Sequence, residues 1–378
     1  MSGVLDKILK NSTIKLTSRL SKSTFFEKTD FVQTQVPMIN VLFSGRMDGG
    51  IASGTTIFAA PSKHFKTAFL LLCIRAFQDK YPEGVAVFLD SEFGSPPAYF
   101  ESFGIDMDRV AHIPIKDIEE LKFEMMRQLN TLDEDTHVIF AIDSLGNLAS
   151  KKEIDDAIEG ESITDMTRAK SLKSFFRMVT PHLKIKNIPM IVSQHVYKEQ
   201  SKYAPEILAG GRGQEYSADN IYFISRAQDK NDKTKEIDGW EFKVIVKKSR
   251  FVKESSTMTL EVSYGEGINS WSGLLEIAIE SGHVDNSSQG WYIKKGEDKK
   301  YRKDDTNTKQ FWESILQDET FQEFVTDKYL LKPGSILQDL SKEEPDEENA
   351  TEHVESDVNE NETNATFEDL KPKKKRAK

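Results

Sequence analysis

The sequence predicts an α/β protein whose central sheet is mostly parallel and is extended by antiparallel strands. Continuously apolar stretches such as GVAVFLD and HVIFAID alternate with helical ones, which is typical of strands covered by helices on both faces. Later stretches, NIYFIS, WEFKVIVKK and TMTLEVSY, follow one another without helices, which indicates antiparallel pairing. The 378 residues, 38% of them hydrophobic, suffice for one large core, a smaller second domain and tails.

The order of these patterns predicts four parts. An N-terminal helix precedes the paired Phe25 and Phe26, which have little local core to join and are expected to dock on a neighbouring subunit. The core is expected to begin with a strand or turn at residues 36–54. Near the C-terminus, a helix, a basic hairpin and two capped amphipathic helices form a small α+β domain. Residues 1–35 are expected to form an N-terminal oligomerisation segment, and residues 36–271 the core. Residues 272–340 are expected to form a small C-terminal DNA-interacting domain, and residues 341–378 a tail.

The tail carries much of the net charge of -11. Residues 343–370 contain twelve Asp and Glu and no Lys or Arg, and the basic stretch KPKKKRAK follows. The tail has few large apolar residues, and burying them would not offset the conformational entropy lost on ordering. We therefore expect this acidic tail with its basic end to be disordered. It serves solubility, or it is an electrostatic gate that competes with an anionic ligand for basic surfaces.

Cysteine content and hydropathy indicate the compartment. The single cysteine, Cys73, lies in the apolar stretch FLLLCIRAF, which excludes a disulfide within the chain and favours a reducing cytoplasm. The N-terminus has no long apolar region, and no stretch approaches 18 apolar residues. We therefore expect a cytoplasmic protein that neither is exported nor spans a membrane.

The stretch FAAPSKHFKT, residues 58–67, resembles a phosphate-binding loop without its glycines. The usual loop has a glycine, four residues, then glycine, lysine and serine or threonine, because bare backbone N–H groups surround the phosphates. Ala60 and Phe65 stand in the glycine places, and Lys66 and Thr67 stand where the lysine and hydroxyl belong. The alternative is an ordinary strand, turn and helix start with a solvated lysine.

Polar residues at other strand ends favour the phosphate-binding interpretation. Ligands of such sheets bind at the carboxyl ends of the strands. The strand FLD leads through Asp90 to Glu92, HVIFAID ends at Asp143, and IPMIVSQH ends at Gln194 and His195. With the loop, these four consecutive strand ends fit nucleotide hydrolysis.

Each of these residues has a role in that chemistry. Thr67 would coordinate Mg²⁺ and Asp143 would hold its water shell, while Lys66 neutralises the outer phosphates of ATP. Glu92 would orient the attacking water. Gln194 or His195 would report the γ-phosphate, and the sequence leaves open which of the two points inward.

The same stretches carry a family resemblance. FAAPSKHFKT, FLDSEFGSPPAYF, VIFAIDSLGNLASKKE, DMTRAKSLKSFFRMVTP, NIPMIVSQH, GGRGQEYSADN and VIVKKSR occur in the order seen in RecA-type recombinases. The chain most closely resembles the UvsX-type recombinases of T-even-like phages, over roughly residues 5–335. That phage group also lacks the second loop glycine, whereas Ala60 departs from its pattern.

The resemblance implies further roles. Glu92 matches the catalytic glutamate, His195 the γ-phosphate sensor, and Tyr99 an aromatic that stacks on adenine, although a buried edge aromatic is the alternative. Lys248 and Arg250 match cations that reach the nucleotide of the adjacent subunit; an exposed strand end is the alternative. The implied nucleotide contacts are Ala60, Pro61, Ser62, Lys63, His64, Phe65, Lys66, Thr67, Tyr99 and Asp143.

Two segments after strand ends are expected to contact DNA, residues 153–170 and 197–219. The second is long for a connection in a compact domain, and its glycines and cations suit a phosphate chain. A solvated surface is the alternative for any single lysine, and for the basic hairpin of the C-terminal domain, which would otherwise attract duplex DNA. The expected DNA-binding residues are Arg168, Lys170, Lys198, Lys202, Gly210, Gly211 and Arg212.

The predicted function is that of a DNA-dependent ATPase. It forms filaments on single-stranded DNA and catalyses homologous pairing and strand exchange in phage recombination, repair and recombination-dependent replication. ATP, Mg²⁺, single- and double-stranded DNA and further copies of the chain are implied, with a single-strand-binding protein and a loading mediator as partners. The alternatives are a ring-forming replicative helicase on the same core and a filament mediator that binds nucleotide without hydrolysing it.

Overall fold

The computed structural model describes residues 2–23, 29–133, 136–160, 167–198, 206–230, 235–286 and 290–332. Several predicted features lie outside these residues: the Phe25–Phe26 pair, residues 161–166 and 199–205 of the segments expected to contact DNA, the latter with Lys202, residues 333–340 of the C-terminal domain, and the tail.

The described residues contain a nine-stranded sheet in the order β11-β10-β9-β8-β1-β5-β4-β2-β3. The six strands from β8 to β3 are parallel, and β9, β10 and β11 continue the sheet antiparallel, which confirms the predicted α/β class. The strands are β1 (Gly54–Ala59), β2 (Val85–Asp90), β3 (Val110–Pro114), β4 (Val138–Asp143), β5 (Pro189–Gln194), β8 (Asn220–Lys230), β9 (Ile237–Lys248), β10 (Thr257–Ser263) and β11 (Gly267–Ile268).

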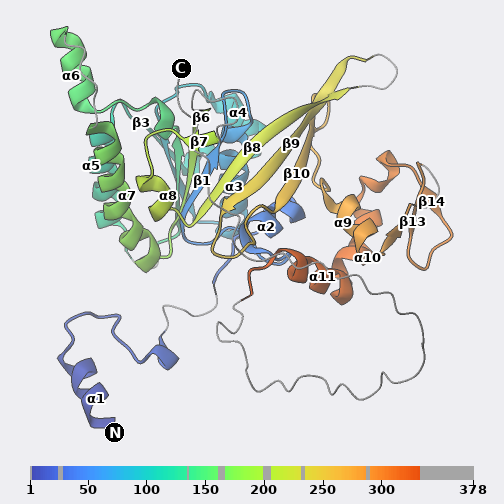
Figure 1. Cartoon of the computed structure of the whole chain (residues 1–378), viewed down its shortest axis with the longest axis horizontal. Coiled ribbons are helices and arrows are strands. Elements are labelled where there is room, and N and C mark those ends of the chain that lie inside the picture. Colours follow the sequence, from blue (N-terminus) through green and yellow to red (C-terminus); the bar gives the residue numbers. More distant parts are fainter. Residues whose placement is uncertain are drawn as a thin grey trace, which may run out of the picture. The chain divides into compact units, whose positions relative to one another are not determined.

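Helices cover both faces of the parallel part, because successive apolar side chains of each strand point to opposite sides. Phe58 of β1 belongs to the core under α3, whereas Ile57 belongs to the core under α5 and α7. Figure 1 shows these helices beside the sheet. The helices up to β8 are α1 (Ser2–Asn11), α2 (Pro37–Ser44), α3 (Lys66–Lys80), α4 (Pro97–Ser102), α5 (Ile118–Thr131), α6 (Lys151–Glu159), α7 (Thr167–Ile185) and α8 (Gly213–Ser217).

The segment expected to enter the core as a strand or turn is instead the helix α2, so that prediction is wrong. Pro37 occupies its first turn, where the missing N–H costs nothing, and Gly45 ends it in a left-handed conformation. All seven residues from Met38 to Ser44 are buried, including the polar Asn40 and Ser44, so burial along this helix shows no helical period. A short apolar run of this kind does not distinguish helix from strand.

The strand β3 was missed, and the four polar strand ends are therefore not consecutive along the chain. It follows the one-turn helix Met107–Arg109 and pairs with β2 at the end of the sheet, and none of its five residues is fully buried. An edge strand with exposed side chains lacks the apolar run that identified its neighbours. The strands β1, β2, β4 and β5 end as predicted.

The later elements agree with the sequence analysis. The strands β8 and β9 run side by side as a long antiparallel pair (Figure 1). The predicted helix, hairpin and paired helices near the C-terminus all form, and Phe311, Trp312 and Val325 join the same apolar core that lies under α3. Their bounds are α9 (Leu274–Glu280), β12 (Val284–Asp285), β13 (Tyr292–Lys294), β14 (Lys300–Tyr301), α10 (Lys309–Gln317) and α11 (Glu319–Tyr329).

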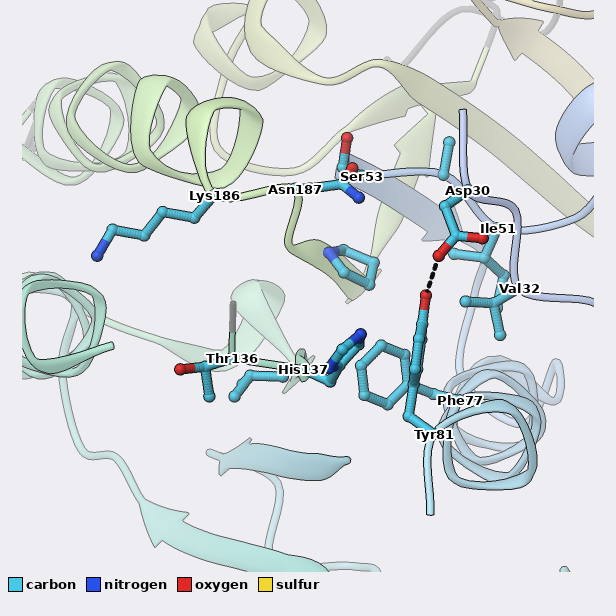
Figure 2. A pocket seen from close by; sticks show the side chains of 13 residues that line it. Asp30, Val32, Ile51, Ser53, Phe77, Tyr81, Thr136, His137, Lys186 and Asn187 are labelled. Atoms are coloured by element: carbon cyan, nitrogen blue, oxygen red, sulfur yellow. Dashed lines mark hydrogen bonds between the residues drawn. The ribbon is translucent and has the colours of Figure 1, made fainter. Parts of the chain in front are cut away.

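A cavity of 190 Å³ lies at the amino ends of the parallel strands (Figure 2). The rings of Tyr81 and His137 lie 3.9 Å apart between centroids, and the Tyr81 hydroxyl donates to Asp30 at 2.5 Å. These polar groups contact one another, and burial raises the pKa of Tyr81. The predicted active-site residues lie at the opposite side of the sheet, at the carboxyl ends of the parallel strands. Among the described residues, no helix is both long and apolar enough to cross a membrane.

Candidate active site

The loop between β1 and α3 has the form of a phosphate-binding loop. The strand ends at Ala59 and the helix begins at Lys66, as predicted. Lys63 and Phe65 adopt left-handed φ angles of 61° and 65°, which place the backbone where a glycine is usually required. The loop therefore keeps its shape without glycines.

The Lys66 amine lies beneath this loop. Its side chain is only 7% exposed, and Nζ donates to the carbonyl oxygen of Pro61 at 3.0 Å. Burial lowers the pKa of Lys66, while the nearby charges of Glu92 and Asp143 oppose that shift. A buried amine in a cleft that carboxylates share is suited to an anionic ligand.

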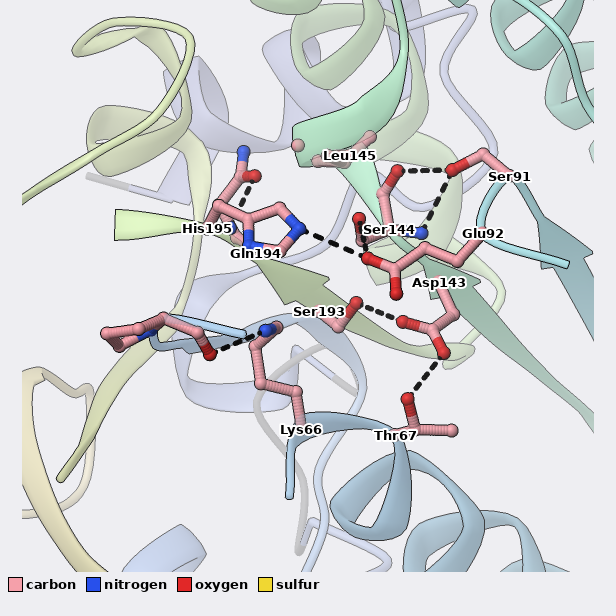
Figure 3. Close-up of polar contacts among 12 residues, drawn as sticks. Lys66, Thr67, Ser91, Glu92, Asp143, Ser144, Leu145, Ser193, Gln194 and His195 are labelled. Carbon is pink, nitrogen blue, oxygen red and sulfur yellow. Dashed lines mark hydrogen bonds and ion pairs between the residues drawn. The ribbon is translucent and has the colours of Figure 1, made fainter. Parts of the chain in front are cut away.

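Asp143, at the end of β4, joins the loop to the next strand end (Figure 3). Its Oδ2 accepts a hydrogen bond of 2.6 Å from the Thr67 hydroxyl, and its Oδ1 accepts one from Ser193. Burial raises the pKa of Asp143, the Ser193 and Thr67 hydroxyls oppose the shift, and the charge of Glu92 adds to it. Hydroxyl and carboxylate oxygens this close are the ligand types that Mg²⁺ prefers, so the pair fits that ion.

Glu92 projects from the loop after β2 into the same cavity. Its Oε1 accepts a hydrogen bond of 2.6 Å from the Ser144 hydroxyl and lies 3.1 Å from Nε2 of His195. The His195 contact lowers the pKa of Glu92 most, Ser144 and the Lys66 charge add to it, and burial opposes it, which leaves a pKa of about 2. Glu92 is therefore ionised at neutral pH and held in one orientation.

Gln194 and His195 point in different directions. The fully buried Gln194 amide donates to Ala209 at 3.0 Å and to the Gln214 side chain at 2.9 Å, which turns it toward α8. The His195 ring faces Glu92 and packs on Gly146, where an added Cβ would lie 2.1 Å from His195 Cδ2. Of the two candidates, the structure brings His195 to the carboxylate.

The loop and the residues at the ends of β2 and β4 line a cavity of 290 Å³. Tyr99 reaches it from α4, its ring packing edge-on to Phe103 at 5.6 Å, and burial raises its pKa, with the Asp143 charge adding to the shift. The lining residues are Ser62, Lys63, His64, Phe65, Lys66, Thr67, Glu92, Gly94, Ser95, Tyr99 and Asp143.

Lys248 and Arg250 do not join this cavity within one chain. Lys248 donates from Nζ to the Glu215 carbonyl at 2.6 Å, and Arg250 pairs with Asp219. Asp219 also accepts the Thr55 backbone N–H at 2.9 Å, at the amino end of β1, whereas the loop follows the carboxyl end of that strand. Because β9 runs antiparallel to β8, it carries both cations away from the loop.

The predicted DNA-binding residues fall around α7 and α8. Lys170 and Arg212 are exposed, and Gly210 and Gly211 have positive φ angles of 91° and 85°. The backbone of Lys198 lies in β6 (Val196–Lys198), which pairs with β7 (Glu206–Leu208).

Arg168 differs from the other predicted DNA contacts. Its guanidinium donates to the carbonyls of Leu148, Leu145 and Gly146 at 2.8, 3.1 and 3.0 Å, and burial lowers its pKa. These bonds hold the turn after β4, so Nε and Nη2 of Arg168 donate within the chain.

Besides Gly94 and Ser95, which line the cavity, three residues that shape the site were not assigned a role from the sequence. Ser193 precedes Gln194 and His195 at the end of β5, and its hydroxyl donates a hydrogen bond to Asp143. Ser144 follows Asp143, and its hydroxyl donates a hydrogen bond to Glu92. Gly146 gives the His195 ring its space. The alternation of side chains along β5 was a usable signal for Ser193, whereas no local pattern indicates Gly146.

The loop, the buried Asp143 and the ionised Glu92 at the carboxyl edge of a parallel sheet define an ATPase of the P-loop class with a RecA-like core. The family model of the RecA N-terminal domain matches residues 30–269. The chain belongs to the RecA family of recombinases. A second family model, the C-terminal domain of the bacteriophage T4 recombination and repair protein, matches residues 271–325.

Individual relatives agree with both matches. The recombination and repair protein of Enterobacteria phage T4 is 40% identical over 341 residues, which cover 88% of this chain and 87% of the relative. Protein RecA of Clostridioides difficile is 27% identical over 71% of this chain and 75% of its own length. Protein RecA of Enterococcus hirae is 28% identical over 65% and 69%.

The family and its phage branch confirm the resemblance and the function predicted from the sequence. The protein is a DNA-dependent ATPase of the recombinase class, which binds DNA, forms filaments and acts in phage recombination and strand exchange. The comparisons favour neither the helicase nor the non-hydrolysing mediator.

Proposed function

We propose that residues 60–67 hold the phosphates of ATP and that Thr67 and Asp143 hold Mg²⁺. The observation that carries this proposal is the hydrogen bond between Thr67 and Asp143 at the start of α3, beneath a loop in which Lys63 and Phe65 have left-handed φ angles. When bound, Mg²⁺ would supply charge neutralisation at the outer phosphates. Lys66 would add a second positive charge there, once its amine leaves the Pro61 carbonyl for the phosphates.

Glu92 is the residue that would orient the attacking water. Its pKa of about 2 keeps it as a carboxylate at neutral pH, so it accepts a proton from water rather than donating one to a phosphate. Ser144 and His195 both hold Oε1, which leaves Oε2 for the water. Tyr99, on the wall of the cavity, would stack on adenine.

His195 is the proposed sensor of the γ-phosphate, and Gln194 is the proposed link to DNA. A γ-phosphate would draw the His195 ring away from Glu92 and so shift the His195 backbone. The His195 backbone N–H donates a hydrogen bond of 2.9 Å to Gln194 Oε1, so Gln194 would move as well. The Gln194 amide in turn holds Ala209 and Gln214, which flank Gly210 and Gly211. Nucleotide state and the expected DNA-binding segment would thus share one chain of hydrogen bonds.

Lys248 and Arg250 would act on the nucleotide of an adjacent subunit. Support comes from their position toward the amino edge of the sheet, away from the loop of their own chain. A cation across the interface would stabilise charge on the transferring phosphoryl group and make hydrolysis depend on assembly.

The DNA surface would include Lys170, Lys198, Lys202, Arg212 and the paired glycines, with Arg168 supporting the turn beneath them. Residues 272–340 would form a second, duplex-facing domain. A single-strand-binding protein and a loading mediator are the expected partners, and the host cytoplasm is the expected compartment.

The experiment that tests the site compares Lys66→Ala with Lys116→Ala, an exposed lysine before α5. DNA-stimulated ATP hydrolysis and displacement-loop formation should disappear in the first variant and persist in the second. Normal turnover by Lys66→Ala would place the nucleotide elsewhere. Unwinding of forked DNA by hexameric rings, without pairing, would favour the helicase.

A further inference from the structure

The phosphate loop has an unusual conformation for its sequence. Lys63 and Phe65 hold left-handed φ angles of 61° and 65°, a region that side chains other than glycine rarely occupy. Such a backbone persists only where the surrounding structure holds it. In this chain the holding contacts come from β8 and β9, far away in the sequence.

The first contact is a ring stack. The Phe65 ring lies 4.8 Å from the Phe242 ring of β9, with planes 17° apart, and packs edge-on to Phe69 of α3 at 6.3 Å. Phe242 is 3% exposed and belongs to the core, so its ring is fixed. The residue that replaces the second glycine is therefore anchored by its own side chain.

The second contact is a hydrogen bond to the other left-handed residue. Arg226 of β8 donates from Nη1 to the Lys63 carbonyl at 2.7 Å. Its guanidinium lies 4.0 Å from the centroid of the Trp240 ring, and the Trp240 indole donates to the Tyr264 hydroxyl at 2.8 Å. The stack limits the freedom of the arginine and aims its donors at the loop.

Both contacts come from one rung of the sheet, because Arg226 and Phe242 are direct partners in the β8–β9 ladder. We propose that Arg226 and Phe242 are positioning residues, a clamp that holds the phosphate loop in its binding conformation before nucleotide arrives. The inference rests on the proposed nucleotide site. It assigns to the antiparallel extension the task of stabilising a loop that lacks its glycines.

Hydrogen exchange in the nucleotide-free protein tests the clamp without any ligand. Phe242→Leu keeps an apolar side chain of most of the volume but removes the stacked ring, so exchange of the amides in residues 62–66 should accelerate about three- to tenfold, the range expected for one aromatic pair. The control is Val244→Ala, two residues along the same buried face of β9, which should leave loop exchange unchanged. Equal exchange in both variants would overturn the proposal.

Nucleotide binding, measured by calorimetry, provides a double-mutant cycle. Phe242→Leu should weaken ATP affinity about three- to tenfold in the parent, yet have no effect when Phe65→Gly has already removed the ring. Additive effects would show that the two rings do not act together and would refute the clamp.

Arg226→Lys should also accelerate exchange of the loop amides. A lysine has no planar group to stack on the Trp240 ring, so its amine is not held in a fixed direction toward the Lys63 carbonyl. Arg302→Lys is the matched control, since Arg302 stacks on Trp291 at 3.6 Å in the C-terminal part and does not contact the loop. If Lys66→Ala binds ATP as the parent does, the proposed site fails, while the exchange results still decide whether the clamp exists.

Discussion

The Glu92 carboxylate should stabilise the fold at neutral pH and lose that effect in acid. Its pKa is about 2, against an ordinary value of 4.5, chiefly because His195 and Ser144 donate to the ionised form. At 1.36 kcal/mol per pKa unit this difference corresponds to about 3 kcal/mol. The side chain is 30% exposed, so solvent screening reduces the effect, and we expect about 1 to 2 kcal/mol.

The sign follows from the lowered pKa. The stabilisation is complete above the unfolded value of 4.5 and declines as pH falls toward the folded value of about 2. Glu92→Gln removes the charge, so its free energy of unfolding should lie below the parent by about 1 to 2 kcal/mol at pH 7. That gap should narrow below pH 4.5.

The assay is urea denaturation of both proteins at pH 7, 5 and 3, at a concentration where neither assembles. Glu83→Gln, at an exposed carboxylate before β2, controls for the loss of one negative charge. A gap that stays constant with pH would show that the hydrogen bonds to Glu92 do not favour its ionised form.

Three further predictions concern turnover, assembly and the tail. Glu92→Gln should bind ATP normally but stall hydrolysis and leave filaments on DNA; normal turnover would make Glu92 merely structural. Mixing Lys66→Ala with a Lys248→Ala, Arg250→Ala protein should restore part of the ATPase, and no recovery despite labelled co-assembly would refute action between subunits. Truncation after Lys342 should raise duplex-DNA affinity most at low salt, where the Debye length is about 30 Å at 0.01 M. Because truncation also deletes the basic end, a charge-neutral tail that retains this end is the cleaner test, and unchanged binding would favour a role in solubility.

The sequence predicted the carboxyl edge of the sheet well, because that edge is determined by local patterns. Buried parallel strands are continuous apolar runs, and the polar residues that end or follow each run mark the rim. Asp143 and Glu92 were located in this way, and the structure places both at one cavity with Thr67. The start of α3 at Lys66 followed from the same pattern.

Features that depend on tertiary contacts could not be predicted. Adjacent residues of a strand face opposite ways, so the sequence showed that Gln194 and His195 diverge but not which one meets Glu92. That choice depends on the space above Gly146 and on the distant Gln214 amide. Likewise, α2 is buried on all sides, so its sequence lacks the period that identifies a surface helix.

The missing glycines show why a sequence motif can fail to identify a phosphate-binding loop whose backbone conformation the fold still maintains. The motif records one solution, a residue that reaches the left-handed region without strain. This chain keeps the same backbone with Phe65, whose ring gains the Phe242 stack in return for the conformational cost. Phe242, which compensates for the missing glycine, lies 177 positions away in the sequence. A motif search confined to residues 58–67 therefore does not recognise this stretch as a phosphate-binding loop.

The direction of β9 connects this loop to assembly. A parallel strand in that position would end at the carboxyl edge and bring Lys248 toward the phosphates of its own chain. The antiparallel strand instead ends toward the amino edge, beside Glu215 and Asp219. If these cations serve a nucleotide, it must belong to another copy, stacked so that its carboxyl edge faces this amino edge. Such an interface joins two different surfaces head to tail, which builds an open filament wherever the repeated rotation does not close into a ring. Under the two proposals, β9 would both hold the loop through Phe242 and lead to the cations that act on the next subunit.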